Sequence, residues 1–173
     1  YEGRLPDHRS WSGFHPPLYY AVGAVIWHAL PDGVPVHAAL RLLSLAFGAG
    51  AVALAYHFLA ARLGRVDAAV VAAVAFCTPV VAIATSMLGN ETSCAFFVTA
   101  ALARLCTLPA GGGPSPGHAA VTGLLAGLGA LAKATGVIAV GSVLASYALR
   151  LWRAPRRALP VLTAAAAGPI LLL

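Results

Sequence analysis

The sequence has very little charge. Of its 173 residues, 5 are Asp or Glu and 11 are Lys or Arg, so 9% are charged while 60% are hydrophobic. Soluble domains usually carry about a quarter of their residues as charged side chains. This deficit excludes an ordinary soluble domain and indicates a chain that is solvated mainly by lipid.

Cysteines and metal-binding patterns are also scarce. Cys77, Cys94 and Cys106 are isolated within or next to apolar runs, which excludes a disulfide framework and a zinc site. The histidines have no metal-ligand spacing, so no metal site is predicted. The glycine run 111–113 has no Lys-Ser/Thr after it and no strand before it, and it is therefore not a phosphate-binding loop.

Long uncharged runs are abundant instead. Residues 42–61 and 68–90 contain 20 and 23 residues without Asp, Glu, Lys or Arg. Roughly 20 apolar residues in a helix cross a bilayer. The sequence therefore predicts an all-α fold, a polytopic integral membrane helical bundle with an interfacial helix before the first span. The predicted spans are about 38–61, 67–89, 92–108, 118–132, 134–152 and 158–173.

Two interruptions divide the apolar sequence. Residues 109–117 are rich in Gly and Pro and are predicted to be a loop. Residues 118–152 are too many for one span, and Lys133 lies near their middle with Gly136 close by, so two helices are expected to meet around Lys133. Gly123 and Gly127 form a small-xxx-small pair, which is typical of close helix packing.

The arginines predict an orientation. Arg62 and Arg65 flank one short connection, and four of the residues 150–157 are arginine, which is typical of cytoplasmic loops. Counting spans then places Glu91 and the break near Lys133 on the extracytoplasmic side. The same topology accounts for the net charge of +6, so nucleic-acid binding is not expected.

Residues 1–35 are expected to form an extracytoplasmic loop and an interfacial helix. Pro16 and Pro17 restrict the backbone, hold His15 extended and allow a helix to start at Leu18. The apolar run 18–30 would reach only about 20 Å as a helix, which is too short to cross the hydrocarbon. Its aromatic residues, which include Tyr19 and Tyr20, favour the membrane interface.

Ionisable groups at membrane depth are the candidate functional residues. The topology predicts that Glu91, Lys133 and His15 face one extracytoplasmic cleft. Each has a structural alternative: Lys133 can snorkel to the interface, Glu91 can belong to a polar helix start after Asn90, and His15 can be interfacial. Arg41, at the outer end of its span, can be a membrane anchor or a phosphate ligand.

Four motifs, in this order, resemble the polytopic glycosyltransferases of the GT-C class, with the protein O-mannosyltransferase and aminoarabinose-transferase group most similar. The resemblance covers nearly the whole chain. The motifs are His15-Pro-Pro-Leu-Tyr-Tyr20, Arg41-Leu-Leu-Ser-Leu45, Gly89-Asn-Glu91 before Phe96-Phe97, and Gly123-Leu-Leu-Ala-Gly-Leu-Gly-Ala-Leu-Ala-Lys133-Ala-Thr-Gly136.

This resemblance implies a multi-pass enzyme of the cell membrane that transfers a sugar, with inversion, from a polyprenyl-phosphate donor to an extracytoplasmic protein, lipid or glycan. Lys133, with His15 and Arg41, would bind the donor phosphate, and Glu91 would orient the acceptor or share base duty. No cofactor is firmly implied, and a divalent cation is left open. Arg, Ala and Gly usage favours a bacterial source. The structural motif residues would be Pro16, Pro17, Tyr19, Tyr20 and Asn90.

One feature departs from the family pattern. In the family the main catalytic acid, usually Asp, follows a first membrane helix and lies well ahead of the His-Pro-Pro motif. Asp7 is only eight residues before His15, which is too near to match that spacing, so the catalytic acid is expected upstream of Tyr1. Residues 1–173 would then be part of one transmembrane domain that lacks its first helix and its C-terminal region, and they would be inactive alone. The alternative is a multi-span transporter with an intramembrane Lys/Glu site.

Overall fold

The computed structural model describes residues 17–31, 33–78, 89–108, 113–152 and 155–172. Within these ranges every regular element is a helix, which confirms the predicted all-α class. The helices are α1 (Leu18–Ala29), α2 (Val36–Leu63), α3 (Arg65–Phe76), α5 (Glu91–Cys106), α6 (Pro116–Ala132), the 3-10 turn η2 (Ala134–Gly136), α7 (Val137–Leu151) and α8 (Pro155–Leu172).

Two of the described helices are long and apolar enough to cross a membrane, namely α2 and the continuous stretch Ala134–Leu151 formed by η2 and α7. The apolar helices α1, α6 and Ala158–Leu172 of α8 are shorter, and α5 has 16 residues. These features suggest membrane association. The larger number of spans, and the interfacial position of α1, stay predictions.

Local sequence signals explain where several helices begin and end. α1 begins at Leu18, directly after Pro17, as the two prolines predicted. α6 begins at Pro116, so residues 116–117 are helical and the predicted loop at 109–117 was wrong at its C-terminal end. The reason is a capping signal: the Ser115 side chain accepts a hydrogen bond from the His118 N–H at 3.2 Å, and proline is favourable in the first turn.

α6 ends where the sequence predicted a break. Lys133 has extended backbone angles, φ −152° and ψ 138°, and the chain then turns through η2 into α7. A Cβ at Gly136 would overlap the carbonyl group of Gly129, so only glycine lets the two segments approach this closely. The break therefore depends on local sequence and leaves Lys133 between two helix ends.

α6 packs most tightly against α8. A Cβ on Gly123 would overlap the backbone of Ala165, and a Cβ on Gly127 would lie 2.9 Å from Cα of Pro169. This confirms that both glycines are helix-packing positions. The surrounding core includes Val143 and Tyr147 of α7.

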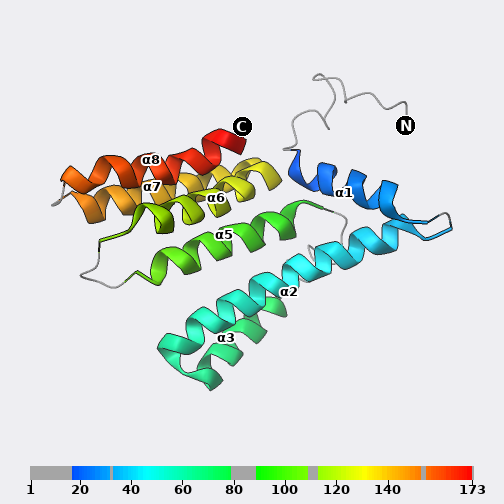
Figure 1. Cartoon of the computed structure of the whole chain (residues 1–173). Helices are drawn as coiled ribbons and strands as arrows, with labels where there is room; N and C mark the ends of the chain where they lie inside the picture. Colours follow the sequence, from blue (N-terminus) through cyan, green and yellow to red (C-terminus); the bar gives the residue numbers. More distant parts are fainter. Residues whose placement is uncertain (1–16, 32, 79–88, 109–112, 153–154, 173) are drawn as a thin grey trace.

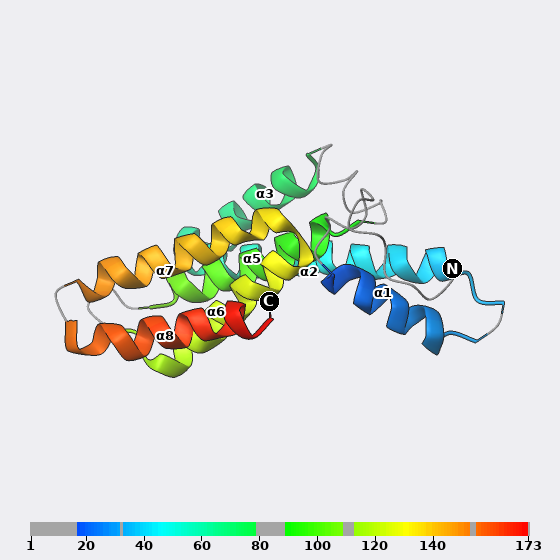
Figure 2. The ribbon, with the colours of Figure 1, turned by 90° about the horizontal axis from the view of Figure 1, so that it is seen from above.

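The described helices alternate in direction, so that their ends meet in two groups (Figure 1). The C-termini of α2, α5 and α7 and the N-termini of α6 and α8 lie at one end, to the left in Figure 1. The N-terminus of α5, the C-terminus of α6 and the N-terminus of α7 lie toward the other end. Figure 2 shows α1 beside the first half of α2, near this second end.

Basic and aromatic side chains connect the helices at the first end. The Arg62 guanidinium donates to the Cys106 carbonyl at 2.7 Å and lies 3.9 Å from the centre of the Phe58 ring. His118 Nε2 lies 3.1 Å from the Arg104 carbonyl, and its Nδ1 lies 2.9 Å from the Tyr147 hydroxyl. Because a carbonyl oxygen can only accept, Nε2 donates, and the neutral ring then accepts from Tyr147. These contacts join α2, α5, α6 and α7.

Candidate functional site

Lys133 and Glu91 form an ion pair at the second end of the bundle. The Lys133 Nζ lies 2.9 Å from Glu91 Oε1, although the two residues are 42 positions apart in the sequence. Lys133 is the extended residue that ends α6, and Glu91 is the first residue of α5. The structure therefore brings together two of the residues that the sequence assigned to one cleft.

Both members of this pair are accessible. The exposed fractions of their side chains are 34% for Lys133 and 48% for Glu91. Partly exposed ion pairs contribute about 0–1 kcal/mol to stability because water screens them and ordering the side chains costs entropy. The pair therefore contributes little to the stability of the helix bundle. Because both side chains are exposed, both charged groups can reach a ligand.

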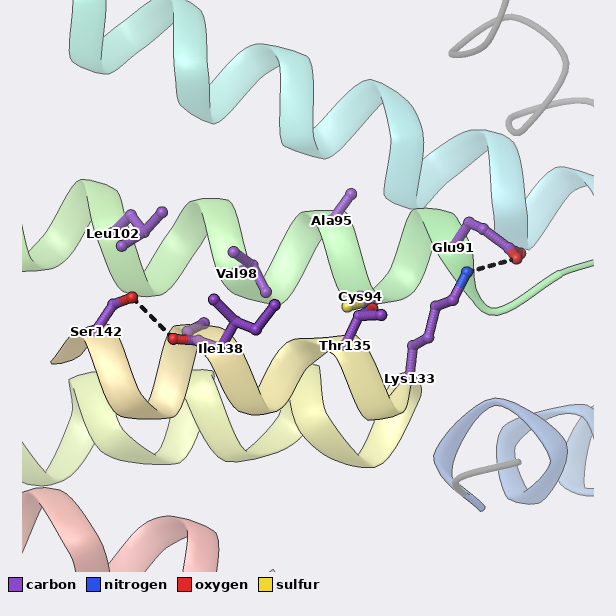
Figure 3. Close-up of a pocket in the computed structure, with 10 residues that line it drawn as sticks. Glu91, Cys94, Ala95, Val98, Leu102, Lys133, Thr135, Ile138 and Ser142 are labelled. Carbon is purple, nitrogen blue, oxygen red and sulfur yellow. Dashed lines mark hydrogen bonds and ion pairs between the residues drawn. The ribbon is translucent and has the colours of Figure 1, made fainter. Parts of the chain in front are cut away.

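Two helix N-termini are located at this ion pair. α5 begins at Glu91, and η2 with α7 begins directly after Lys133 at Ala134. A helix N-terminus carries a partial positive charge, which favours Glu91 in the first turn of α5. The start of η2 and α7 places a second partial positive charge beside the Lys133 backbone, while the Lys133 side chain extends toward the start of α5 (Figure 3). This combination favours an anion near Lys133.

A groove of about 410 Å³ extends from the ion pair between α5 and α7 (Figure 3). Glu91 and Lys133 lie at one end of it, and Leu102 and Ser142 lie at the other. Its lining is mostly apolar, with the hydroxyl of Thr135 and the thiol of Cys94 close to the charged end. The lining residues are Glu91, Cys94, Ala95, Val98, Leu102, Lys133, Thr135, Ile138, Ala139 and Ser142.

Three lining residues of this groove, Cys94, Thr135 and Ser142, were not predicted from the sequence. The isolated position of Cys94 in the sequence indicates no role in the chemistry. A signal was present, because Cys94 is one helical turn after Glu91 and therefore shares its face of α5. Thr135 is two residues after the helix break at Lys133. Ser142 had no comparable signal, and its hydroxyl donates to the Ile138 carbonyl at 2.8 Å.

The approach to α5 is closely packed. A Cβ on Gly89 would overlap Glu91 Oε2, so the carboxylate folds back over this glycine. Asn90 and Thr92 are buried, and neither Asn90 Nδ2 nor Thr92 Oγ1 has a hydrogen-bond partner within the described residues. The Ser93 hydroxyl donates to the Asn90 carbonyl at 2.9 Å. The start of α5 is therefore polar, and the Asn90 side chain makes no capping hydrogen bond there.

The other predicted site residues lie elsewhere or outside the described residues. His15 and Pro16 lie outside them, and Pro17 is exposed just before α1. Arg41 is exposed near the start of α2, makes no hydrogen bond or ion pair with the described residues and does not line the groove. Its phosphate-binding role stays a prediction.

The two tyrosines of the first motif differ in environment. Tyr19 is buried, and its hydroxyl lies 3.3 Å from Ser44 Oγ on α2. Tyr20 is exposed and contacts the ring of Tyr19 edge-on, with 6.0 Å between ring centres. Tyr19 therefore holds α1 against α2.

Among the described residues, no group of three or more His, Cys, Asp or Glu side chains is arranged to hold a metal ion. Four functional groups lie at the charged end of the groove: the ammonium group of Lys133, the carboxylate of Glu91, the thiol of Cys94 and the hydroxyl of Thr135. This set can bind an anion at Lys133 and accept a proton at Glu91.

No protein-family model, curated protein or solved structure matches the chain.

Proposed function

We propose that the chain is part of a polytopic cell-membrane glycosyltransferase that uses a polyprenyl-phosphate-linked sugar donor and an extracytoplasmic acceptor. The proposal combines the GT-C-like motifs with the Lys133–Glu91 pair. In this reaction Lys133 binds the donor phosphate, and Glu91 orients the acceptor hydroxyl or accepts its proton.

The observation that carries the proposal is the position of Lys133. Lys133 lies at a helix break, directly before η2 and α7, and its side chain lines the groove of about 410 Å³. Glycosyl transfer from a lipid phosphate releases a phosphate whose negative charge grows in the transition state. A preorganised cation and helix N-terminus at that position stabilise this charge.

The surface of the described helices supports a membrane location. Large apolar side chains are exposed on α3, α7 and α8, for example Val70, Ile138 and Leu171. Exposed apolar surface of this extent is favourable in lipid and unfavourable in water. With the arginine-rich end toward the cytoplasm, the Lys133–Glu91 end would be extracytoplasmic.

The test is transfer activity of the full-length protein in lipid nanodiscs, with a radiolabelled polyprenyl-phosphate sugar as the donor. We expect Lys133→Ala to lower the transfer rate by at least about 100-fold, which is typical for loss of a group that stabilises transition-state charge. Arg65→Ala is the matched control, because Arg65 is an exposed cation at the start of α3 outside the groove. Normal transfer by Lys133→Ala would contradict the assignment.

A transporter is the second candidate, and the broken helix at Lys133 is the observation that favours it. Transporters often bind solutes where helices are interrupted, and ionisable groups there mark the site. Both activities can be measured on one proteoliposome preparation supplied with labelled sugar phosphate and with the labelled lipid donor. Transport would deliver free label to the lumen, whereas transfer would attach label covalently to an acceptor.

A further inference from the structure

We propose that the Glu91 carboxylate occupies the position on Lys133 that a ligand phosphate takes, so that phosphate binding exchanges one oxyanion for another and releases Glu91. The inference rests on the proposed function, because it treats Lys133 as a phosphate ligand. It links the two ligands at the site. Binding of the donor phosphate to Lys133 increases the availability of Glu91 to the acceptor hydroxyl.

The geometry of the ion pair supports an exchange. The carboxylate oxygen is 2.9 Å from Nζ, at the distance expected for a phosphate oxygen bound to an ammonium group. Both side chains are accessible at the mouth of the groove, so a ligand can approach without unpacking α5 from α6 or α7. Because exposed ion pairs are weak, the existing pair is a small barrier to replacement.

The released carboxylate would remain in a favourable environment. Glu91 is the first residue of α5, where the helix N-terminus stabilises negative charge without Lys133. Its side chain is about half-exposed, so water can also solvate it. Exchange therefore avoids leaving an unpaired charge in a buried position.

Simultaneous tight binding of both oxyanions to Lys133 is unfavourable. A phosphate beside the ammonium group would lie within a few ångströms of the carboxylate, and like charges at this distance repel each other. Repulsion moves the Glu91 side chain away as the phosphate binds. An acceptor hydroxyl can then contact Glu91, which explains how one residue would serve both the resting site and the acceptor.

Gly89 provides an independent way to move the carboxylate without removing its charge. A Cβ at this position would overlap Glu91 Oε2 and lie 3.4 Å from its Cδ, with no other described atom within 4 Å. Gly89 has no positive φ, so alanine fits its backbone. Gly89→Ala therefore displaces the Glu91 side chain and weakens its contact with Lys133.

The experiment measures binding of farnesyl phosphate and of inorganic phosphate to the full-length protein in uncharged nanodiscs. Glu91→Gln is expected to tighten phosphate binding by about threefold, because the competing ion pair is lost. Gly89→Ala should change the affinity in the same direction by about twofold, on the same scale. Lys133→Gln should weaken binding at least about tenfold. Asp67→Asn, an exposed acid in the first turn of α3, is the matched control and should have no effect.

The outcomes separate the exchange from the function on which it rests. Tighter binding by both Glu91→Gln and Gly89→Ala supports the exchange, and tightening confined to farnesyl phosphate also identifies a lipid-linked ligand. If the wild type binds and Lys133→Gln does not, but Glu91→Gln leaves the affinity unchanged or lower, the exchange is overturned and the proposed function stands. Absence of saturable binding to the wild-type protein overturns both.

Discussion

The two ends of the helical bundle both carry basic side chains, but they place them in different surroundings. At one end, Arg62 binds the main-chain carbonyl of Cys106 at 2.7 Å and lies against Phe58. At the other end, Lys133 contacts the side-chain carboxylate of Glu91 beside a groove. One cation is bound to the backbone of another helix, and the other is bound to a group that can move.

This difference indicates that the arginine stabilises the fold, whereas the lysine is suited to bind a ligand. A basic side chain at the last carbonyls of a helix satisfies acceptors that have no partner within the helix and interacts favourably with the helix dipole. A cation paired with an exposed carboxylate makes little difference to stability. We therefore expect substitutions at the arginine-rich end to change the free energy of unfolding and those at the lysine end to change ligand binding.

The largest expected loss of stability follows His118→Ala. This change removes the hydrogen bonds to the Arg104 carbonyl and to the Tyr147 hydroxyl, and Tyr147 is fully buried at 0% exposure. The Arg104 carbonyl still accepts hydrogen bonds from the N–H and the hydroxyl of Thr107. The main cost is therefore the lost contact at the buried Tyr147 hydroxyl, which should lower the free energy of unfolding by about 1–3 kcal/mol. Denaturant unfolding in detergent micelles measures it, with the exposed His57→Ala as control. Equal stability of the two variants would contradict a structural role for His118.

Tyr147→Phe should have a smaller effect. It keeps the ring in the core and removes only the hydroxyl that contacts His118 Nδ1 at 2.9 Å. The expected loss is about 1–2 kcal/mol, since one hydrogen bond is lost and the imidazole nitrogen is left unsatisfied. The same unfolding measurement applies. Tyr56→Phe is the matched control, because the Tyr56 hydroxyl makes no hydrogen bond with the described residues, and this variant should unfold like the wild type.

Arg62→Gln is expected to cost about 1 kcal/mol or less. The guanidinium loses its contact with the Cys106 carbonyl and its position over Phe58, but the site is exposed to solvent, which screens both interactions. Thermal unfolding at low and at high salt measures the effect, and Arg65→Gln is the control. If Arg62→Gln lowers the stability no more than Arg65→Gln does, the contacts of Arg62 do not stabilise this end of the bundle.

Lys133→Gln should have the smallest effect on stability, below about 0.5 kcal/mol, because its ion pair is partly exposed. The same variant should lose phosphate binding, and this contrast is the sharpest test of the comparison. Unfolding and phosphate affinity are measured on one preparation. If Lys133→Gln destabilises the protein more than Arg62→Gln does, the ion pair supports the fold and the distinction between the two ends is wrong.

Much of the helical organisation could be predicted from the sequence. The apolar run 118–152 was too long for one span, and the break near Lys133 lies where the extended backbone occurs. The end of the loop at 109–117 was predicted incorrectly, because the prediction used the Gly and Pro content of the segment and did not use the capping signal of Ser115 and Pro116. Helix boundaries depend on one or two local hydrogen bonds, which composition does not reveal.

The candidate site was predicted less completely than the helices. Topology brought Glu91 and Lys133 to the same end, and the structure joins them in an ion pair, while their roles stay proposals. Arg41 was grouped with them, but it is on α2 and does not line the groove. Which side chains share a groove depends on the rotation of each helix about its axis, and span counting contains no information on that rotation.

The sequence alone determined the low charge and high apolar content, the helical class and the position of the break at Lys133. These depend on the transfer of side chains between water and lipid and on local backbone preferences, both of which act on neighbouring residues. Only the tertiary structure decided that Glu91 pairs with Lys133 and that Cys94 and Thr135 line the groove beside them. Contacts between residues 42 positions apart depend on how α5, α6 and α7 pack, and packing is a property of the whole bundle.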